Sequence, residues 1–217
     1  MNLNLRALLS TFLFLVLTTG LAYPLLVTAI AQTFFPFQAN GSLIVKNGTA
    51  VGSRLIGQNF TSEGYFWGRP SATTPYPYNA GLSGGSNLGP LNPALVQSVS
   101  SRIQALQAAD PGNRAPMPVD LATSSASGLD PHISLSAARY QIGRIARARR
   151  MPMEVVDGLI ATHLVPPLFS STGEARVNVL ELNLALDNLK EHYSIFNIKE
   201  LLDSWHEKAR YSVNLKR

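Results

Sequence analysis

The sequence ALLSTFLFLVLTTGLAYPLLVTAIAQ, residues 7–32, decides the architecture of this chain. It contains no charged residue, and none occurs between Arg6 and Lys46. A helix of about 20 apolar residues spans the hydrocarbon core of a bilayer, so this stretch is long enough to cross a membrane even when tilted. Pro24 lies inside it, and membrane helices tolerate proline better than exposed soluble helices do. We therefore predict a transmembrane helix within residues 1–35.

A cleaved signal peptide is the alternative interpretation of this stretch. Ala29-Ile30-Ala31 resembles an A-x-A cleavage site. The apolar run before it is longer than the usual apolar region of about 7–15 residues, which favours a retained anchor. Arg6 lies in the short N-terminal flank, so the positive-inside rule weakly favours a cytoplasmic N-terminus. The rest of the chain is then expected to be extracytoplasmic.

Composition sets further limits on function. The 217 residues suffice for one domain with a real core and appendages. The absence of cysteine excludes disulfides, thiolate-zinc sites and a cysteine nucleophile. The formal charge of +5 is modest, and it permits an anionic partner without requiring one.

Residues 36–187 show a mixed pattern that predicts an α+β domain. Runs of β-branched and aromatic residues bounded by Gly, Asn and Pro predict strands at Ser42–Val45, Ser53–Ile56 and Tyr65–Trp67. Alternation also favours a strand at Arg176–Leu186, although its second half consists of good helix formers. Apolar periodicity predicts helices from Pro93 to Asp110, at Leu135–Arg150, at Pro152–His163 and at Asn197–Tyr211. Gly68–Pro93, rich in Pro, Gly and Ser, is a long loop of the functional or mobile kind.

Within that loop, Leu82-Ser83-Gly84-Gly85-Ser86 resembles the LSGGQ signature with which ABC ATPases contact a nucleotide. Backbone N–H groups of such a turn can bind a phosphate at a helix N-terminus. The chain has neither a G-x-x-x-x-G-K-[ST] loop nor a strand-flanked G-x-G-x-x-G. The alternative, which we favour, is that Gly84 and Gly85 allow a tight turn with positive φ.

Other candidate residues have competing interpretations. His132 follows Asp130 by two positions, so this pair either forms a local Asp–His contact or cation ligand, or stabilises a turn. No H-E-x-x-H or G-x-S-x-G motif occurs, so nothing favours catalysis. The arginines between residues 139 and 150 form either a nucleic-acid surface or a solvated or docking helix face, and an extracytoplasmic location disfavours nucleic acid. Tyr65-Phe66-Trp67, followed by Arg69, either stacks on a partner or lies in the core, which we favour.

Several segments together resemble one family. They are Tyr23–Thr28, Gln38–Leu43, Gly52–Gln58, Tyr65–Ala72, Tyr78-Asn79, Ser83–Pro90, Asn92-Pro93, Ser127–Ser134, Arg176–Leu180, Leu182-Asn183 and Ala185–Asp187. Their order and spacing over residues 5–187 resemble the C subunit of the bacterial Kdp potassium-transporting ATPase, the KdpC family. Residues 188–217 lie beyond the resemblance, and we expect a helical C-terminal extension there.

The resemblance implies a non-catalytic accessory subunit with an extracytoplasmic domain on one N-terminal helix in the bacterial plasma membrane. Its implied partners are a channel-like potassium-binding subunit, which handles potassium, and a P-type ATPase subunit. The family subunit is needed for assembly and activity of the pump. It has been proposed as a catalytic chaperone that raises the affinity for ATP, and Ser83, Gly84, Gly85, Ser86 and Asn87 are the implied nucleotide or partner loop.

The predicted topology conflicts with direct binding of cytoplasmic ATP, because a bilayer core of about 30 Å separates an external Ser83 from the cytoplasm. We therefore expect no directly bound cofactor, and a loop that faces the potassium-binding subunit. The other candidate partner contacts are Tyr23, Pro24, Tyr65, Phe66, Trp67, Arg69, Asp130 and His132. A membrane-anchored hydrolase and an extracytoplasmic binding protein are the alternative functions.

Overall fold

The computed structural model describes residues 4–167 and 173–193. The chain divides into two compact units, residues 1–53 and residues 54–217, which we describe separately. The predicted helix Asn197–Tyr211 and most of the predicted extension 188–217 lie outside the described residues.

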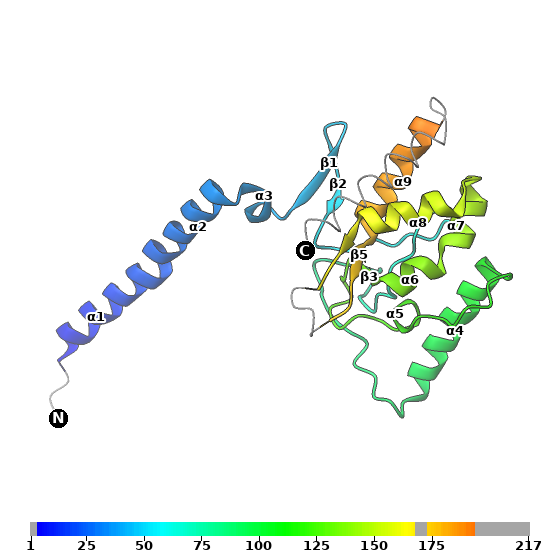
Figure 1. Cartoon of the computed structure of the whole chain (residues 1–217). Helices are drawn as coiled ribbons and strands as arrows, with labels where there is room; N and C mark the ends of the chain where they lie inside the picture. Colours follow the sequence, from blue (N-terminus) through cyan, green and yellow to red (C-terminus); the bar gives the residue numbers. More distant parts are fainter. Residues whose placement is uncertain (1–3, 168–172, 194–217) are drawn as a thin grey trace. The chain divides into compact units, whose positions relative to one another are not determined.

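The first unit is dominated by one long apolar helix. It consists of α1 (Leu5–Leu17), a π-helical turn η1 (Thr18–Ala22) and α2 (Tyr23–Phe34), which follow one another without interruption (Figure 1). No residue of these elements is buried within the chain. Among the described residues, this 30-residue helix is the only one long and apolar enough to cross a membrane. A helix of the predicted kind is therefore present.

A short helix and a hairpin complete the first unit. Helix α3 (Pro36–Ala39) leads into the antiparallel strands β1 (Leu43–Lys46) and β2 (Thr49–Ser53). The prediction of a strand at Ser53–Ile56 is wrong, because the chain turns back earlier. Asn47 and Gly48 have φ angles of 52° and 78°. This Asn-Gly pair with two positive φ angles is typical of a two-residue type I′ hairpin turn.

The second unit contains the α+β body. Its elements are α4 (Pro93–Ala109), α5 (Val119–Ala122), β3 (His132–Ser134), α6 (Leu135–Tyr140), α7 (Ile142–Arg149), α8 (Met153–Thr162), β4 (Leu164–Val165), β5 (Arg176–Asn178) and α9 (Val179–Tyr193). The three short strands form an antiparallel sheet in the order β3-β5-β4. Helix α4 begins and ends as predicted, since the Asn92 side chain accepts a hydrogen bond from Ala94 N–H at 2.9 Å and Asp110 ends it.

Three predicted elements of the second unit differ from the structure. The strand expected at Tyr65–Trp67 is absent, because these residues have no neighbouring strand in the described part of the chain and no regular secondary structure. The helix expected at Leu135–Arg150 is divided at Gln141 into α6 and α7. The strand expected at Arg176–Leu186 ends at Asn178, and α9 begins at the next residue, Val179. The Asn178 side chain accepts a hydrogen bond from Glu181 N–H at 3.2 Å, which is the arrangement of a helix N-cap.

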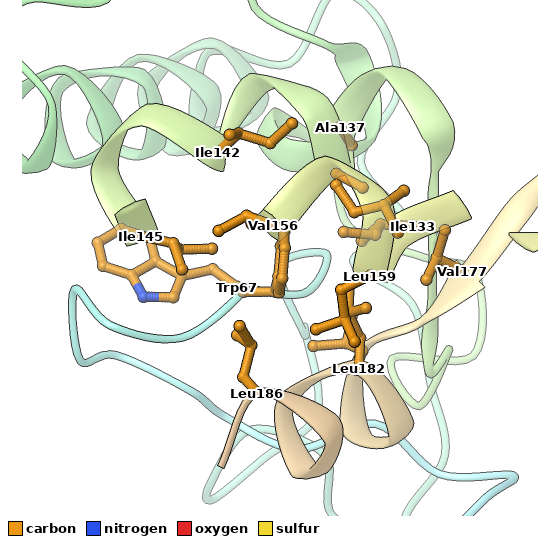
Figure 2. Packing of buried hydrophobic residues seen from close by; sticks show 14 of the residues in the cluster. Trp67, Ile133, Ala137, Ile142, Ile145, Val156, Leu159, Val177, Leu182 and Leu186 are labelled. Carbon is orange, nitrogen blue, oxygen red and sulfur yellow. The ribbon is translucent and has the colours of Figure 1, made fainter. Parts of the chain in front are cut away.

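The core lies where the sheet meets helices α6 to α9. Figure 2 shows side chains from these elements converging on one centre, among them Ile133 of β3, Val156 of α8 and Leu186 of α9. Each of these three is fully buried or nearly so. Trp67 and Phe66 join this core from a segment with no regular secondary structure. The second unit therefore has one apolar core, and the loops described next lie around it.

Candidate functional site

The stretch Ser83–Asn87 runs beside the loop that contains Ser127. Gly84 N–H donates to the Ser127 carbonyl oxygen at 2.9 Å, and the Ser83 hydroxyl donates to the same oxygen at 3.0 Å. A phosphate bound to the backbone of this turn would need the Gly84 N–H, which already donates its hydrogen bond to the Ser127 carbonyl. Ser86 and Asn87 are exposed. Helix α4 begins only at Pro93, so this stretch is not its N-terminus.

The positive φ angles predicted for Gly84 and Gly85 are wrong. In this part of the fold the positive angles belong to Asn87, at 52°, and to Gly128, at 66°. Glycine is required at position 85 for a different reason, since a Cβ there would lie 2.8 Å from the carbonyl oxygen of Ala126. A contact of this stretch with a nucleotide or a partner stays a prediction.

The preceding part of the loop is fixed by the hydroxyl groups of Ser71 and Tyr78. The Ser71 hydroxyl donates to the Gly128 carbonyl at 2.7 Å and accepts from Tyr78 N–H at 2.8 Å. The Tyr78 hydroxyl donates to the Arg69 carbonyl at 2.6 Å. Burial raises the pKa of Tyr78 to about 12, so the phenol stays neutral and keeps donating at physiological pH. The loop is therefore held to the body by its own side chains.

Three of the predicted partner residues meet in one pocket of about 710 Å³. An Arg69 guanidinium nitrogen lies 3.3 Å from the Asp130 carboxylate, which also accepts a hydrogen bond from His132 N–H at 3.0 Å. The imidazole Nδ1 of His132 lies 3.5 Å from the same carboxylate. The local Asp–His contact proposed from the sequence is therefore present, within a turn that it stabilises.

The charge state of Asp130 follows from these neighbours. Burial raises the pKa of its carboxyl, but the hydrogen bonds from His132 and the positive charge of Arg69 outweigh burial. The pKa of Asp130 therefore lies below its ordinary value, and the group is ionised at neutral pH. A second guanidinium nitrogen of Arg69 donates to the Ser124 carbonyl at 3.2 Å, so Arg69 links the carboxylate to the loop that precedes it.

Asp120, which the sequence did not single out, forms the other side of the pocket. Its carboxylate accepts from Ser134 N–H at 2.7 Å and from the Ser134 hydroxyl at 3.2 Å. Strand β3 is an edge strand, and Asp120 and Asp130 thus occupy its N–H groups at Ser134 and His132. A carboxylate on an exposed N–H of an edge strand blocks pairing with another strand. Asp120 belongs to the short helix α5 and precedes Ser134 by 14 positions in the sequence, and no local sequence pattern indicated this contact.

The aromatic segment lies in the core, as favoured from its sequence. Phe66 is fully buried and Trp67 nearly so. The Arg144 guanidinium lies 4.3 Å from the centroid of the Trp67 ring, which is a close cation–π contact. Tyr65 is partly buried, and its hydroxyl donates to the Asp187 carboxylate at 3.1 Å. A partner contact by these aromatic residues stays a prediction, and Tyr65 has the more accessible side chain.

The remaining candidates, Tyr23 and Pro24, lie in the first unit at the start of α2. Tyr23 is 64% exposed within the chain, so its side chain is available to lipid or to another protein. The pocket and the loop belong to the second unit.

Comparison with known proteins identifies the family. The family model described as "K+-transporting ATPase, c chain" (KdpC) matches residues 5–188. This chain belongs to the KdpC family.

Similar proteins share most of their length with this KdpC-family chain. A potassium-transporting ATPase KdpC subunit of Polaromonas naphthalenivorans (strain CJ2) is 63% identical over 186 residues, which are 86% of this chain and 95% of that protein. The protein of the same name from Variovorax paradoxus (strain S110) is 62% identical over 187 residues, or 86% of this chain and 97% of that one. That of Dechloromonas aromatica (strain RCB) is 56% identical over 191 residues, or 88% and 100%.

The KdpC match includes every candidate site residue in both units, from Tyr23 to His132. It ends at residue 188, inside helix α9, which continues to Tyr193. The resemblance noted over residues 5–187 is therefore confirmed, and residues beyond 188 lie outside the family model.

Proposed function

We propose that this chain is an accessory, non-catalytic subunit of a potassium-transporting ATPase in the bacterial plasma membrane. One observation carries the proposal. A chain whose family is named for an ATPase chain has a long apolar helix, Leu5–Phe34, and no residue of that helix is buried within the chain itself. A helix of this length spans a bilayer core of about 30 Å. In this proposal the N-terminus lies in the cytoplasm and the second unit outside, and the positive charge of Arg6 at the start of the helix supports that orientation through the positive-inside rule.

The partners in this proposal are a channel-like potassium-binding subunit and a P-type ATPase subunit. The chain assembles with both and is needed for the activity of the pump. The loop around Ser83–Asn87 faces the potassium-binding subunit near the external entrance of its pore. In support, residues 70–101 contain no charged residue and no histidine. Leu82 and Leu91 in this segment are 57% and 95% exposed. Cores of protein interfaces are depleted in charge, so this surface fits an uncharged protein partner.

An effect of the chain on ATP affinity is indirect in this proposal. The Ser83 hydroxyl and the Gly84 N–H already donate to Ser127, and the bilayer separates them from cytoplasmic ATP. Coupling between the external domain and the ATPase subunit then requires an element with two states that both ends can bias. The membrane helix is the element of this chain that reaches both sides.

The alternatives, an independent hydrolase and a free-standing binding protein, are not favoured, because the match to an ATPase chain covers residues 5–188. Co-purification tests the proposal. A tagged chain should bring down two larger membrane proteins, and its deletion should stop growth only at low potassium. Purification of the chain alone with a hydrolytic activity of its own, and normal growth of the deletion strain, would contradict the proposal.

A further inference from the structure

The backbone hydrogen bonds of the membrane helix are interrupted near its middle. A helical carbonyl normally accepts from the N–H four residues later, or five residues later in a π turn. At the end of η1, Tyr23 N–H donates to the Thr18 carbonyl and not to that of Thr19. The next residue is Pro24, which has no N–H. Both helical donors that could reach the Thr19 carbonyl are therefore absent or already used.

Neither lipid nor the described side-chain hydrogen bonds of residues 4–53 supply a replacement donor. The Thr19 hydroxyl donates to the Leu15 carbonyl at 2.7 Å, one turn earlier. Among the described side-chain hydrogen bonds of this unit, none ends on the Thr19 carbonyl. Thr19 lies in the middle of Leu5–Phe34, so it is far from both membrane surfaces. An unpaired carbonyl is strongly unfavourable there, because hydrocarbon offers no donor.

The helix surface beside this carbonyl is open. A Cβ added to Gly20 would meet no atom within 4 Å. Small residues on a membrane helix let the backbone of another helix approach closely, which also brings interhelical hydrogen bonds within reach. An unpaired acceptor and an accessible glycine therefore lie next to each other at the same depth.

We propose that the Thr19 carbonyl is a docking point for a hydrogen-bond-donating side chain, a hydroxyl or a carboxamide, on a membrane helix of another chain of the ATPase. The inference rests on the proposed function, since it takes the partner from the same complex. A two-fold pair of identical helices is a poorer fit, because it would bring one Thr19 carbonyl toward the other, acceptor against acceptor. The partner's helix packs over Gly20 and donates to Thr19.

Three variants of the full chain, each expressed with all subunits of the pump, test this docking point. Pro24→Ala restores a backbone donor at position 24 and leaves the partner's donor without its acceptor. Gly20→Leu blocks the close approach. Ala22→Leu is the matched control, because it adds similar bulk on the opposite side of the helix from Gly20.

We expect Pro24→Ala and Gly20→Leu to weaken retention of the large subunits by roughly 5- to 30-fold, the range that membrane hydrogen bonds give in model peptides. The Ala22→Leu variant should retain them as the wild type does. Wild-type retention by Pro24→Ala and Gly20→Leu, or an equal loss in Ala22→Leu, would overturn the inference. The inference would also be overturned if two differently tagged copies of this chain were recovered together and Gly20→Leu abolished that recovery. If the wild-type chain itself retains no large subunit, the proposed function fails, and that result is distinct from these.

An infrared measurement follows the carbonyl directly and does not depend on how the Pro24→Ala and Gly20→Leu variants fold. The chain is labelled with carbonyl-¹³C threonine, and a Thr19→Ser chain prepared in the same way provides the spectrum without a label at position 19. The difference band should shift to lower frequency when the labelled chain is assembled with the unlabelled subunits in a bilayer. An unchanged band in the assembled pump would overturn the inference.

Discussion

The side-chain amide of Gln141 forms both backbone hydrogen bonds of Trp67. Its oxygen accepts from Trp67 N–H at 2.8 Å, and its nitrogen donates to the Trp67 carbonyl at 3.1 Å. Asn183 does the same for Phe66, at 2.8 Å and 3.0 Å. Two buried amides thus replace the neighbouring strand that an extended segment in a core normally requires. This arrangement allows Phe66 and Trp67 to be buried without belonging to a sheet.

Replacement of Gln141 by leucine should therefore destabilise the second unit. Gln141 is only 1% exposed, and Gln141→Leu leaves the N–H and the carbonyl of Trp67 unpaired in the core. Each such group costs about 1–3 kcal/mol, so we expect a loss of roughly 2–6 kcal/mol. Urea unfolding of the full chain in detergent, followed by circular dichroism, measures it. The control is Gln107→Leu at an exposed position of α4, and equal midpoints for the two variants would contradict the structural role of Gln141.

How far the sequence predicted the fold depends on the range of the interactions involved. The membrane helix and α4 were predictable, because a long apolar run and an Asn92-Pro93 start are local signals. The start of α9 at Asn178 had a local signal too, the Asn-x-x-Glu spacing to Glu181, which the alternation of leucines outweighed in our interpretation. The contacts of Gln141 with Trp67 span 74 residues, and no local pattern encodes them.

The two glycines of the Ser83–Asn87 stretch should respond differently to alanine. A Cβ at Gly85 would lie 2.8 Å from the Ala126 carbonyl oxygen, whereas at Gly84 it would meet nothing within 4 Å. Gly85→Ala should therefore force the two loops apart, at a cost of about 1–3 kcal/mol. Gly84→Ala should be nearly neutral. Thermal unfolding of both variants tests this, and equal effects would contradict the steric role assigned to Gly85 alone.

Acid should destabilise the chain through Asp130. Its pKa is lower in the folded chain than in the unfolded chain, despite the opposing effect of burial. A group of this kind contributes stability above its unfolded pKa, about 3.9, and loses the contribution as the pH falls through the folded pKa. Asp130→Asn should therefore be less stable than the wild type at pH 7, and the difference should shrink below about pH 4. A difference independent of pH would show that ionisation of Asp130 plays no part.

Of the candidate site, the sequence indicated single residues rather than their arrangement. The Asp130–His132 contact was predictable because the two residues are adjacent in one turn. Arg69 reaches Asp130 across 61 positions, and Asp120 reaches Ser134 from a separate helix, so neither contact had a local signal. The π-helical turn before Pro24 was also not predicted, although proline inside an apolar run indicates that a backbone donor is missing there.

The location of the second unit is tested most directly by labelling in intact cells. The chain has no cysteine, so single cysteines at Ser83 and at Asn2 can be labelled one at a time with a membrane-impermeant thiol reagent. The account predicts labelling at position 83 and none at position 2, which places the second unit outside and excludes direct contact of Ser83 with cytoplasmic ATP. Labelling at position 2 and none at position 83 would contradict it, and would make direct nucleotide binding by Ser83–Asn87 the leading interpretation.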